Sequence, residues 1–198
     1  VDTLAGGFSQ VVALAAEQVA RGDLAMAEIG AGIPPFDLQV SAGLRNAVND
    51  FLRVRDMAFG SLTVDASSKP GRPFSMKMLV NQLATQGMIL DTVSAGVVQQ
   101  NDRLSFYLRL ADNDGTQQNN MALIALGGYV EGHEALLRFL QRNQARETGF
   151  NFGLRASLSD SAVTVTMIPE HPILGFEPWT VNKDNYFTYR FDQEMFAD

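Results

Sequence analysis

The chain has 198 residues, of which 46% are hydrophobic and 19% are charged, a composition typical of an ordered, β-rich protein rather than a disordered one. Its 22 acidic residues outnumber its 15 basic residues, and no stretch carries the Lys/Arg cluster that binding to a phosphate backbone requires, so nucleic acid is not an expected partner. The chain has no cysteine, which excludes disulfides, thiolate nucleophiles and cysteine-bound metal clusters.

The N-terminal part, residues 1–57, is predicted to contain helices. The Ala-rich stretch Phe8–Arg21 places apolar side chains at helical spacing, and Gly22 follows as a stop signal. A second, amphipathic stretch is Gly43–Arg55. Neither approaches the run of about 20 apolar residues that a membrane-spanning helix needs. We therefore expect one or two short helices and no membrane crossing in this part of the chain.

From about residue 58 the apolar period changes from 3.6 to 2, which is typical of strands with one apolar face. The alternation is clearest in Pro73–Leu83, Arg103–Ala111, Phe150–Ser157 and Ala162–Ile168. Turn residues separate the strands, in Ser67–Pro73, Gln100–Asp102, Asp112–Gln118, Glu131–His133, Arg146–Gly149 and Ser159–Ser161. Residues 58–198 are therefore predicted to form an antiparallel meander, in one continuous domain with the N-terminal part. Periodicity alone leaves open whether the sheet closes on itself.

Few residues suggest catalysis or metal binding. The chain has two histidines, His133 and His171, and both lie in turn-like sequence. Asp112–Gly115 resembles the centre of a calcium loop, but the register of an EF-hand would place Leu110 at the first ligand position, so a plain turn is the better interpretation. Gly127, Gly128 and Gly132 lack the spacing of a dinucleotide-binding loop. We predict no enzyme, no cofactor and no metal site.

Methionine is frequent in the predicted strands, at Met76, Met78, Met88, Met121 and Met167. Thioether side chains adapt to irregular apolar neighbours. Core filling is one use for them, and an apolar surface that accepts acyl chains or unfolded strands is the other.

Two stretches near the C-terminus resemble a known family: Glu147–Gly153, which reads ETGFNFG, and Pro169–Tyr186, which reads PEHPILGFEPWTVNKDNY. The stretch GMILDTV from Gly87 is similar as well. Together they resemble TamB, the translocation and assembly module subunit of the AsmA-like group of long envelope proteins. The resemblance covers about residues 58 to 190, and the helical start through Arg55 does not match it.

The resemblance implies a curved, elongated, open sheet with an apolar groove, a β-taco, and no catalytic residues. It implies a non-enzymatic role in outer-membrane biogenesis, through lipid transport between the membranes or through assembly and secretion of β-barrel proteins with an Omp85-family partner. The expected partners are phospholipid acyl chains or unfolded outer-membrane proteins, and the expected location is the periplasm. Since the chain opens with Val1 and has no signal-like start, we expect a fragment of a longer protein anchored in the inner membrane.

Alternation nominates ten residues for the apolar groove, with the reservation that a register shift of one residue would reverse the face of a strand. They are Phe74, Met76, Met78, Leu104, Phe106, Leu108, Phe150, Phe152, Val163 and Val165.

The alternative is a compact β-sandwich or barrel that binds a protein or glycan at the cell surface, through the aromatic residues Tyr107, Tyr129, Trp179 and Tyr189. The proline-rich stretch Pro169–Tyr186 also has a purely structural interpretation. Trp179 would cap the hydrophobic layer, and Asn182–Asn185 would close a hairpin into Tyr186–Phe191.

Overall fold

The computed structural model describes residues 2–69, 72–85, 88–112, 121–191 and 195–197. In this part of the chain three helices accompany one sheet of fourteen strands. The helices are α1 (Asp2–Ala20), α2 (Met26–Gly32) and α3 (Ala47–Arg53). The strands are β1 (Phe36–Ala42), β2 (Met57–Ala58), β3 (Ser61–Lys69), β4 (Arg72–Thr85), β5 (Met88–Gln100), β6 (Arg103–Ala111), β7 (Met121–Glu131), β8 (Glu134–Asn143), β9 (Thr148–Leu158), β10 (Ala162–Met167), β11 (Ile173–Leu174), β12 (Glu177–Pro178), β13 (Phe187–Arg190) and β14 (Met195–Ala197).

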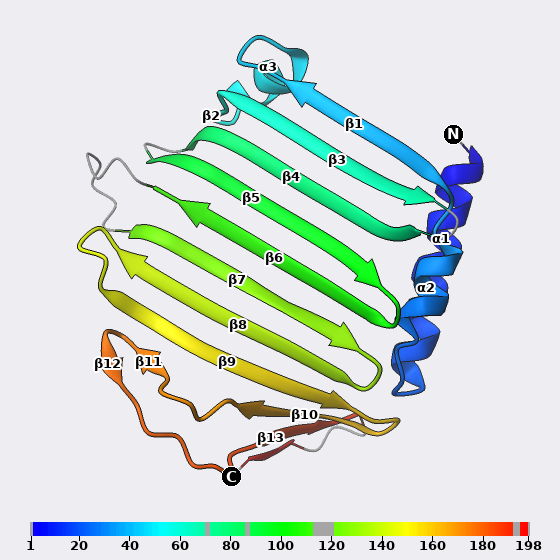
Figure 1. Cartoon of the computed structure of the whole chain (residues 1–198), viewed down its shortest axis with the longest axis vertical. Helices are drawn as coiled ribbons and strands as arrows, with labels where there is room; N and C mark the ends of the chain where they lie inside the picture. Colours follow the sequence, from blue (N-terminus) through cyan, green and yellow to red (C-terminus); the bar gives the residue numbers. More distant parts are fainter. Residues whose placement is uncertain (1, 70–71, 86–87, 113–120, 192–194, 198) are drawn as a thin grey trace.

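The sheet is an open antiparallel meander. From β3 to β10 every strand pairs with the next one along the chain, because the connections are short, while β1 forms one edge beside β3. The last strands turn away from the plane of the others, so the sheet is curved (Figure 1). The prediction of a mainly β, antiparallel, open sheet with N-terminal helices is therefore confirmed, and the compact sandwich or barrel is not the architecture of the described strands.

Helices α1 and α2 lie along one end of the strands (Figure 1). Gln18, which is 2% exposed, joins them: its amide donates to a Glu28 carboxylate oxygen at 3.0 Å and its carbonyl accepts from the Ala25 amide at 2.9 Å. His133 in the β7–β8 turn holds the chain after α1, with Nδ1 2.7 Å from the Gly22 carbonyl. One of the two histidines therefore has a structural contact.

The structure also contains two elements that the periodicity analysis did not predict, α2 and β1. Both lie within residues 1–57, the part predicted to contain one or two short helices. In β1, Phe36, Leu38 and Val40 alternate with polar residues, and the strand completes the sheet edge by pairing with β3. The strand follows Pro34 and Pro35, which end the preceding helix, and it is only seven residues long.

The buried apolar core is small and sits near one end of β4 and β5. It consists of Phe59, Val80, Leu90 and Val93, which are 3–8% exposed. Strand β4 contributes Val80 and also Leu83, which strict alternation would place on opposite faces. Gln82 between them has a φ of 54°, and this left-handed residue turns the strand so that both side chains reach the same cluster.

Asn49 on α3 attaches that helix to the sheet and is fully buried. Its amide group donates to the Leu44 and Phe59 carbonyls at 2.9 and 2.7 Å, and its carbonyl accepts from the Phe59 amide at 2.9 Å. We expect Asn49→Ala to lower the free energy of unfolding by about 2–3 kcal/mol, because buried backbone groups lose their partners. Urea denaturation would measure it. The control is Asp50→Ala on the same helix, which removes an exposed ion pair with Arg53; equal losses in both variants would contradict the expectation.

Candidate functional site: the apolar face of the sheet

The strand register divides the sheet into two faces of different chemistry. Residues directly opposite each other in neighbouring strands share a face, so rows of side chains can be followed across the sheet. We call one side the apolar face, and three rows define it: Leu62–Val80–Val93–Leu110–Ile124–Gln141–Phe150; Val40–Val64–Met78–Ala95–Leu108–Leu126–Phe139–Phe152; and Leu38–Ala66–Met76–Val97–Phe106–Gly128–Leu137–Leu154–Met167. A shorter fourth row runs Leu104–Val130–Ala135–Ala156–Val165–Phe187.

All ten predicted groove residues lie on this face. Eight of them are members of the four rows. Phe74 alternates with Met76 on β4, and Val163 alternates with Val165 on β10. The structure therefore brings together residues from β4, β6, β9 and β10 that are up to 91 positions apart in the sequence. Their role in binding a ligand stays a prediction.

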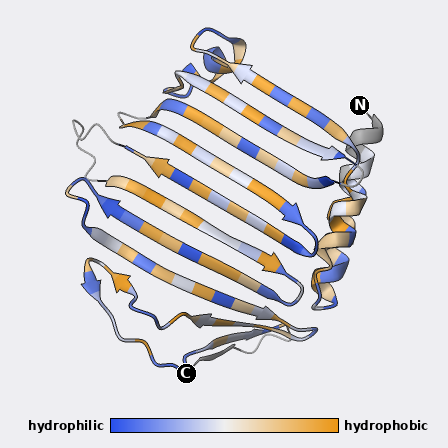
Figure 2. Cartoon of the chain, viewed as in Figure 1, coloured by the Kyte–Doolittle hydropathy of each residue, from blue (hydrophilic) through white to orange (hydrophobic). Residues whose placement is uncertain are grey.

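The four rows contain no Asp, Glu, Lys or Arg, and Gln141 is the amide side chain among the residues that define them. Gln99 of β5 lies opposite Leu104 and adds a second amide at the end of the fourth row. Such a face offers a ligand dispersion contacts and release of water, and it offers almost no hydrogen bonds. Figure 2 shows the strand alternation that separates the two chemistries.

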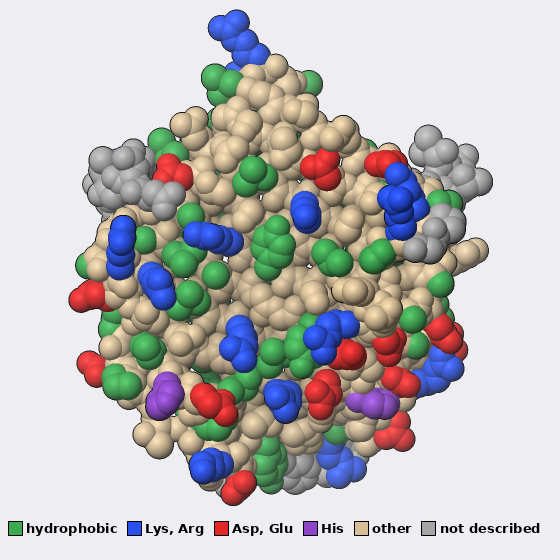
Figure 3. All heavy atoms as spheres, viewed as in Figure 1, with side chains coloured by type: hydrophobic (Ala, Val, Ile, Leu, Met, Phe, Trp, Pro, Cys, Tyr) green, Lys and Arg blue, Asp and Glu red, His purple; other side chains and the backbone are tan. Residues whose placement is uncertain are grey.

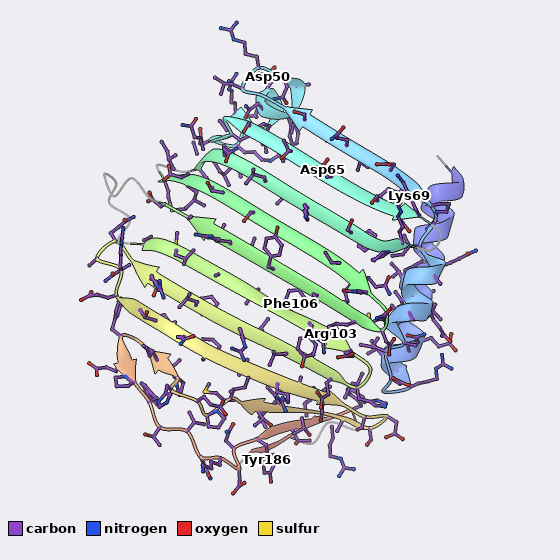
Figure 4. All side chains as sticks on the ribbon, in the orientation of Figure 1. Asp50, Asp65, Lys69, Arg103, Phe106 and Tyr186 are labelled. Carbon is purple, nitrogen blue, oxygen red and sulfur yellow. The ribbon has the colours of Figure 1, made fainter. Side chains whose placement is uncertain are left out.

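Aromatic rings concentrate at the β8–β9 end of the apolar face. The Phe139 ring centroid lies 5.4 Å from that of Phe152 and 6.4 Å from that of Phe150. Phe106, labelled in Figure 4, lies opposite Gly128, where a Cβ would come within 3.1 Å of its ring. The glycine leaves room for the ring to lie against the sheet.

No second layer covers the apolar face in the described part of the chain: α1 and α2 lie at the strand ends, and α3 contacts β2. The total accessible surface is 12630 Å² for 21.6 kDa. A compact monomer of this mass would expose about 9,200 Å². Single exposed apolar residues are common, but a continuous apolar face is typical of an interaction surface.

The opposite side of the sheet, which we call the polar face, carries charged side chains from several strands (Figure 3). Its best-defined ion pair joins Arg103 on β6 and Glu131 on β7, which lie opposite each other. The Arg103 Nη2 atom is 2.6 Å from Glu131 Oε2. The hydrogen bond from this guanidinium to the Glu131 carboxylate raises the pKa of Arg103. Both groups are exposed, so the pair contributes little to stability.

The aromatic residues of the alternative surface do not gather in one place. Tyr107 and Tyr129 belong to the polar face, whereas Tyr189 lies opposite Val163, on the apolar side. Trp179 is 56% exposed, more than expected for a side chain that seals a hydrophobic layer. A turn is present at Asn182–Asn185, with the Asn185 backbone amide donating to the Asn182 carbonyl at 3.3 Å, but it does not close the predicted hairpin. Strand β13 after the turn pairs with β10 and β14, and β12 before it pairs with β11.

Other candidate sites remain separate or fall outside the described residues. Most of the predicted turn at Asp112–Gln118 and of the calcium-like run at Asp112–Gly115 lies outside them. Among the described residues no three His, Cys, Asp or Glu side chains are grouped closely enough to hold a metal ion. In the same residues no helix is both long and apolar enough to cross a membrane.

Comparisons with known proteins give no relative. No family model matches the chain, and neither a curated protein nor a solved structure is significantly similar to it.

Sequence reasoning missed one feature of the polar face, a cleft of about 580 Å³ beside Arg138 on β8 and Arg155 on β9. The two arginines are 17 positions apart in the sequence and face the same way only through the register of β8 and β9. The alternation of each strand indicates that its arginine points away from the apolar face, but not that the two are neighbours.

Proposed function

We propose that the chain is a non-enzymatic segment of a TamB-like protein of the cell envelope, and that its apolar face binds the acyl chains of phospholipids during their transfer between membranes. The observation that carries this proposal is the uninterrupted apolar face, uncovered and free of charge in its rows. Each buried CH₂ group of an acyl chain contributes roughly 0.8 kcal/mol, so a lipid of ordinary chain length could be held without any specific hydrogen bond. The charged head group would stay in water at the margin of the sheet.

The proposal places the segment in the periplasm, within a longer chain anchored in the inner membrane. The resemblance of Glu147–Gly153 and Pro169–Tyr186 to TamB supports this location. It also supports an Omp85-family protein of the outer membrane as partner.

A second candidate is assembly of outer-membrane β-barrel proteins, favoured by the free edge of β1. This strand pairs only with β3 in the described sheet, so one row of its backbone groups is open to an incoming strand. It contains no proline, and its one charged side chain, Asp37, is paired with Lys69. An unfolded client strand could add there by β-augmentation.

Lipid extraction and native mass spectrometry of the protein purified from a bacterial host would test the first candidate. We expect phospholipid to co-purify with the wild type and to be lost from the double variant Phe106→Arg/Phe152→Arg, because a guanidinium on the apolar face would have to be desolvated by the acyl chain. Circular dichroism would check that the variant folds.

The matched control is Ser105→Arg/Ser157→Arg, which adds the same charges to the same strands, β6 and β9, on the polar face. This variant should keep its lipid. A wild-type protein free of lipid, or equal lipid loss in both double variants, would contradict acyl-chain binding by the apolar face.

A further inference from the structure

The polar face carries two neighbouring arginines that have no ion-pair partner among the described residues. Arg138 on β8 lies directly opposite Gly153 on β9, and Arg155 is two residues further along β9 on the same face. Such diagonal neighbours have Cα atoms about 7–8 Å apart, within reach of two long side chains. Both arginines are exposed, and neither forms an ion pair with any described residue.

This pairing is unfavourable in the free protein. Like charges at neighbouring positions of two strands repel each other, and a chain with 22 acidic and only 15 basic residues has ample carboxylates to pair them. Glu170 lines the same cleft, and Glu134, opposite Ser157, is the other diagonal neighbour of Arg155 on this face. Neither carboxylate is within ion-pair distance of a guanidinium of the pair. The repulsion would be relieved by an anion bound between the two side chains.

The two arginines line a cleft that is large enough to hold a ligand. They line the cleft of about 580 Å³ together with Asn151 and Thr166, whose amide and hydroxyl are neutral donors. Gly153 and Ile168 also line it. A Cβ at Gly153 would lie 2.7 Å from Ile168 Cδ1, so the glycine leaves room for the Ile168 side chain in the wall of the cleft.

We propose that this arginine cleft binds a phosphate-type oxyanion. A guanidinium presents paired N–H groups that match two oxygens of a phosphate. Inorganic phosphate and phosphate monoesters have more than two free oxygens, so two guanidinium groups on separate strands can each hold a different pair, whereas a carboxylate offers a single pair. The volume exceeds that of one anion and leaves room for a substituent. The phosphate could be free or belong to a phospholipid head group, and the cleft lies on the face opposite the proposed acyl-chain surface, so the inference does not rest on that function.

Isothermal titration calorimetry with inorganic phosphate, and co-sedimentation with vesicles that contain phosphatidic acid or consist of phosphatidylcholine alone, would test the cleft. We expect Arg138→Gln/Arg155→Gln to weaken phosphate binding, or binding to the anionic vesicles, at least about tenfold, since charge-assisted hydrogen bonds are lost. Arg109→Gln, on the same face but outside the cleft, should bind as the wild type does. Phe106→Arg/Phe152→Arg should also retain binding to inorganic phosphate.

The two ligands distinguish the source of the phosphate. Binding of inorganic phosphate supports a site for the free group, and binding of anionic vesicles alone supports a lipid head group. The proposal is overturned if the wild type binds neither, if it binds acetate as tightly as phosphate, or if Arg138→Gln/Arg155→Gln binds as the wild type does. None of these outcomes depends on whether lipid co-purifies through the apolar face.

Discussion

Replacing Val93 with Asp is expected to lower the free energy of unfolding by about 4 kcal/mol or more, the range reserved for unpaired charges in a core. Val93 is 7% exposed and lies opposite Val80 and Leu110, with Phe59 and Leu90 completing the cluster. A carboxylate there finds apolar neighbours and must either be desolvated or take up a proton. Because the described core has only a few fully buried apolar side chains, no other cluster can compensate for the loss.

Urea denaturation followed by circular dichroism would measure this effect, with Ser94→Asp as the control. Ser94 is the next residue of β5, on the polar face, and lies opposite Arg109. An aspartate there gains an opposite charge across the strands, worth about 0.2–1 kcal/mol, so it should not destabilise. If Val93→Asp were within about 1 kcal/mol of the wild type, burial around Phe59 and Val80 would not be what holds this end of the sheet, since a buried unpaired charge costs several times more.

Alternation within a strand was predictable from the sequence because it depends on neighbouring residues only. In β6, Leu104, Phe106 and Leu108 alternate with Ser105 and Tyr107, and both the bounds Arg103–Ala111 and the division into faces follow from that pattern. The same reasoning placed the apolar residues of β4 and β9. Since each strand presents the apolar side of its pleat to the same side of the sheet, ten residues chosen strand by strand came to lie on one face.

The pattern could not reveal where the backbone departs from a regular strand. At Gln82 a single residue with left-handed backbone geometry brings Val80 and Leu83 into one cluster. The order of apolar residues in the sequence does not predict this change of backbone direction. The short strand β1 was missed for a related reason. It lies between two helical segments and follows two prolines, so its alternation covers too few residues to stand out.

Contacts between strands were the other limit. Arg138 and Arg155 become neighbours only when β8 and β9 pair in the observed register, and a shift of one residue would place one of them on the apolar face. The same applies to Phe106, which fits against the sheet because Gly128 on β7 lies opposite it. The composition of the apolar face was therefore predictable, while the polar cleft behind it required the three-dimensional register.

Ligand-dependent stability follows from the uncovered apolar face and is the second large effect we expect. A molecule that binds only the folded sheet stabilises it by mass action, by about 2.7 kcal/mol at a concentration 100 times its Kd. For a chain of this size, with about 2–4 °C per kcal/mol, a short-chain phosphatidylcholine should raise the Tm by roughly 5–10 °C. Thermal unfolding followed by circular dichroism, below the critical micelle concentration, would measure the shift.

The acyl chains, rather than the head group, should produce that shift. Glycerophosphocholine carries the same head group without acyl chains. In the Arg138→Gln/Arg155→Gln background, which removes the proposed phosphate cleft, it should leave the Tm unchanged because the apolar face offers it almost no hydrogen bonds. Phe106→Arg/Phe152→Arg should lose most of the shift, whereas Ser105→Arg/Ser157→Arg should retain it. A shift of equal size in both double variants would mean that the lipid binds elsewhere, and a shift with glycerophosphocholine would assign the binding to polar groups. The apolar side of an open single-layer sheet would then need a different occupant, such as an incoming strand at β1.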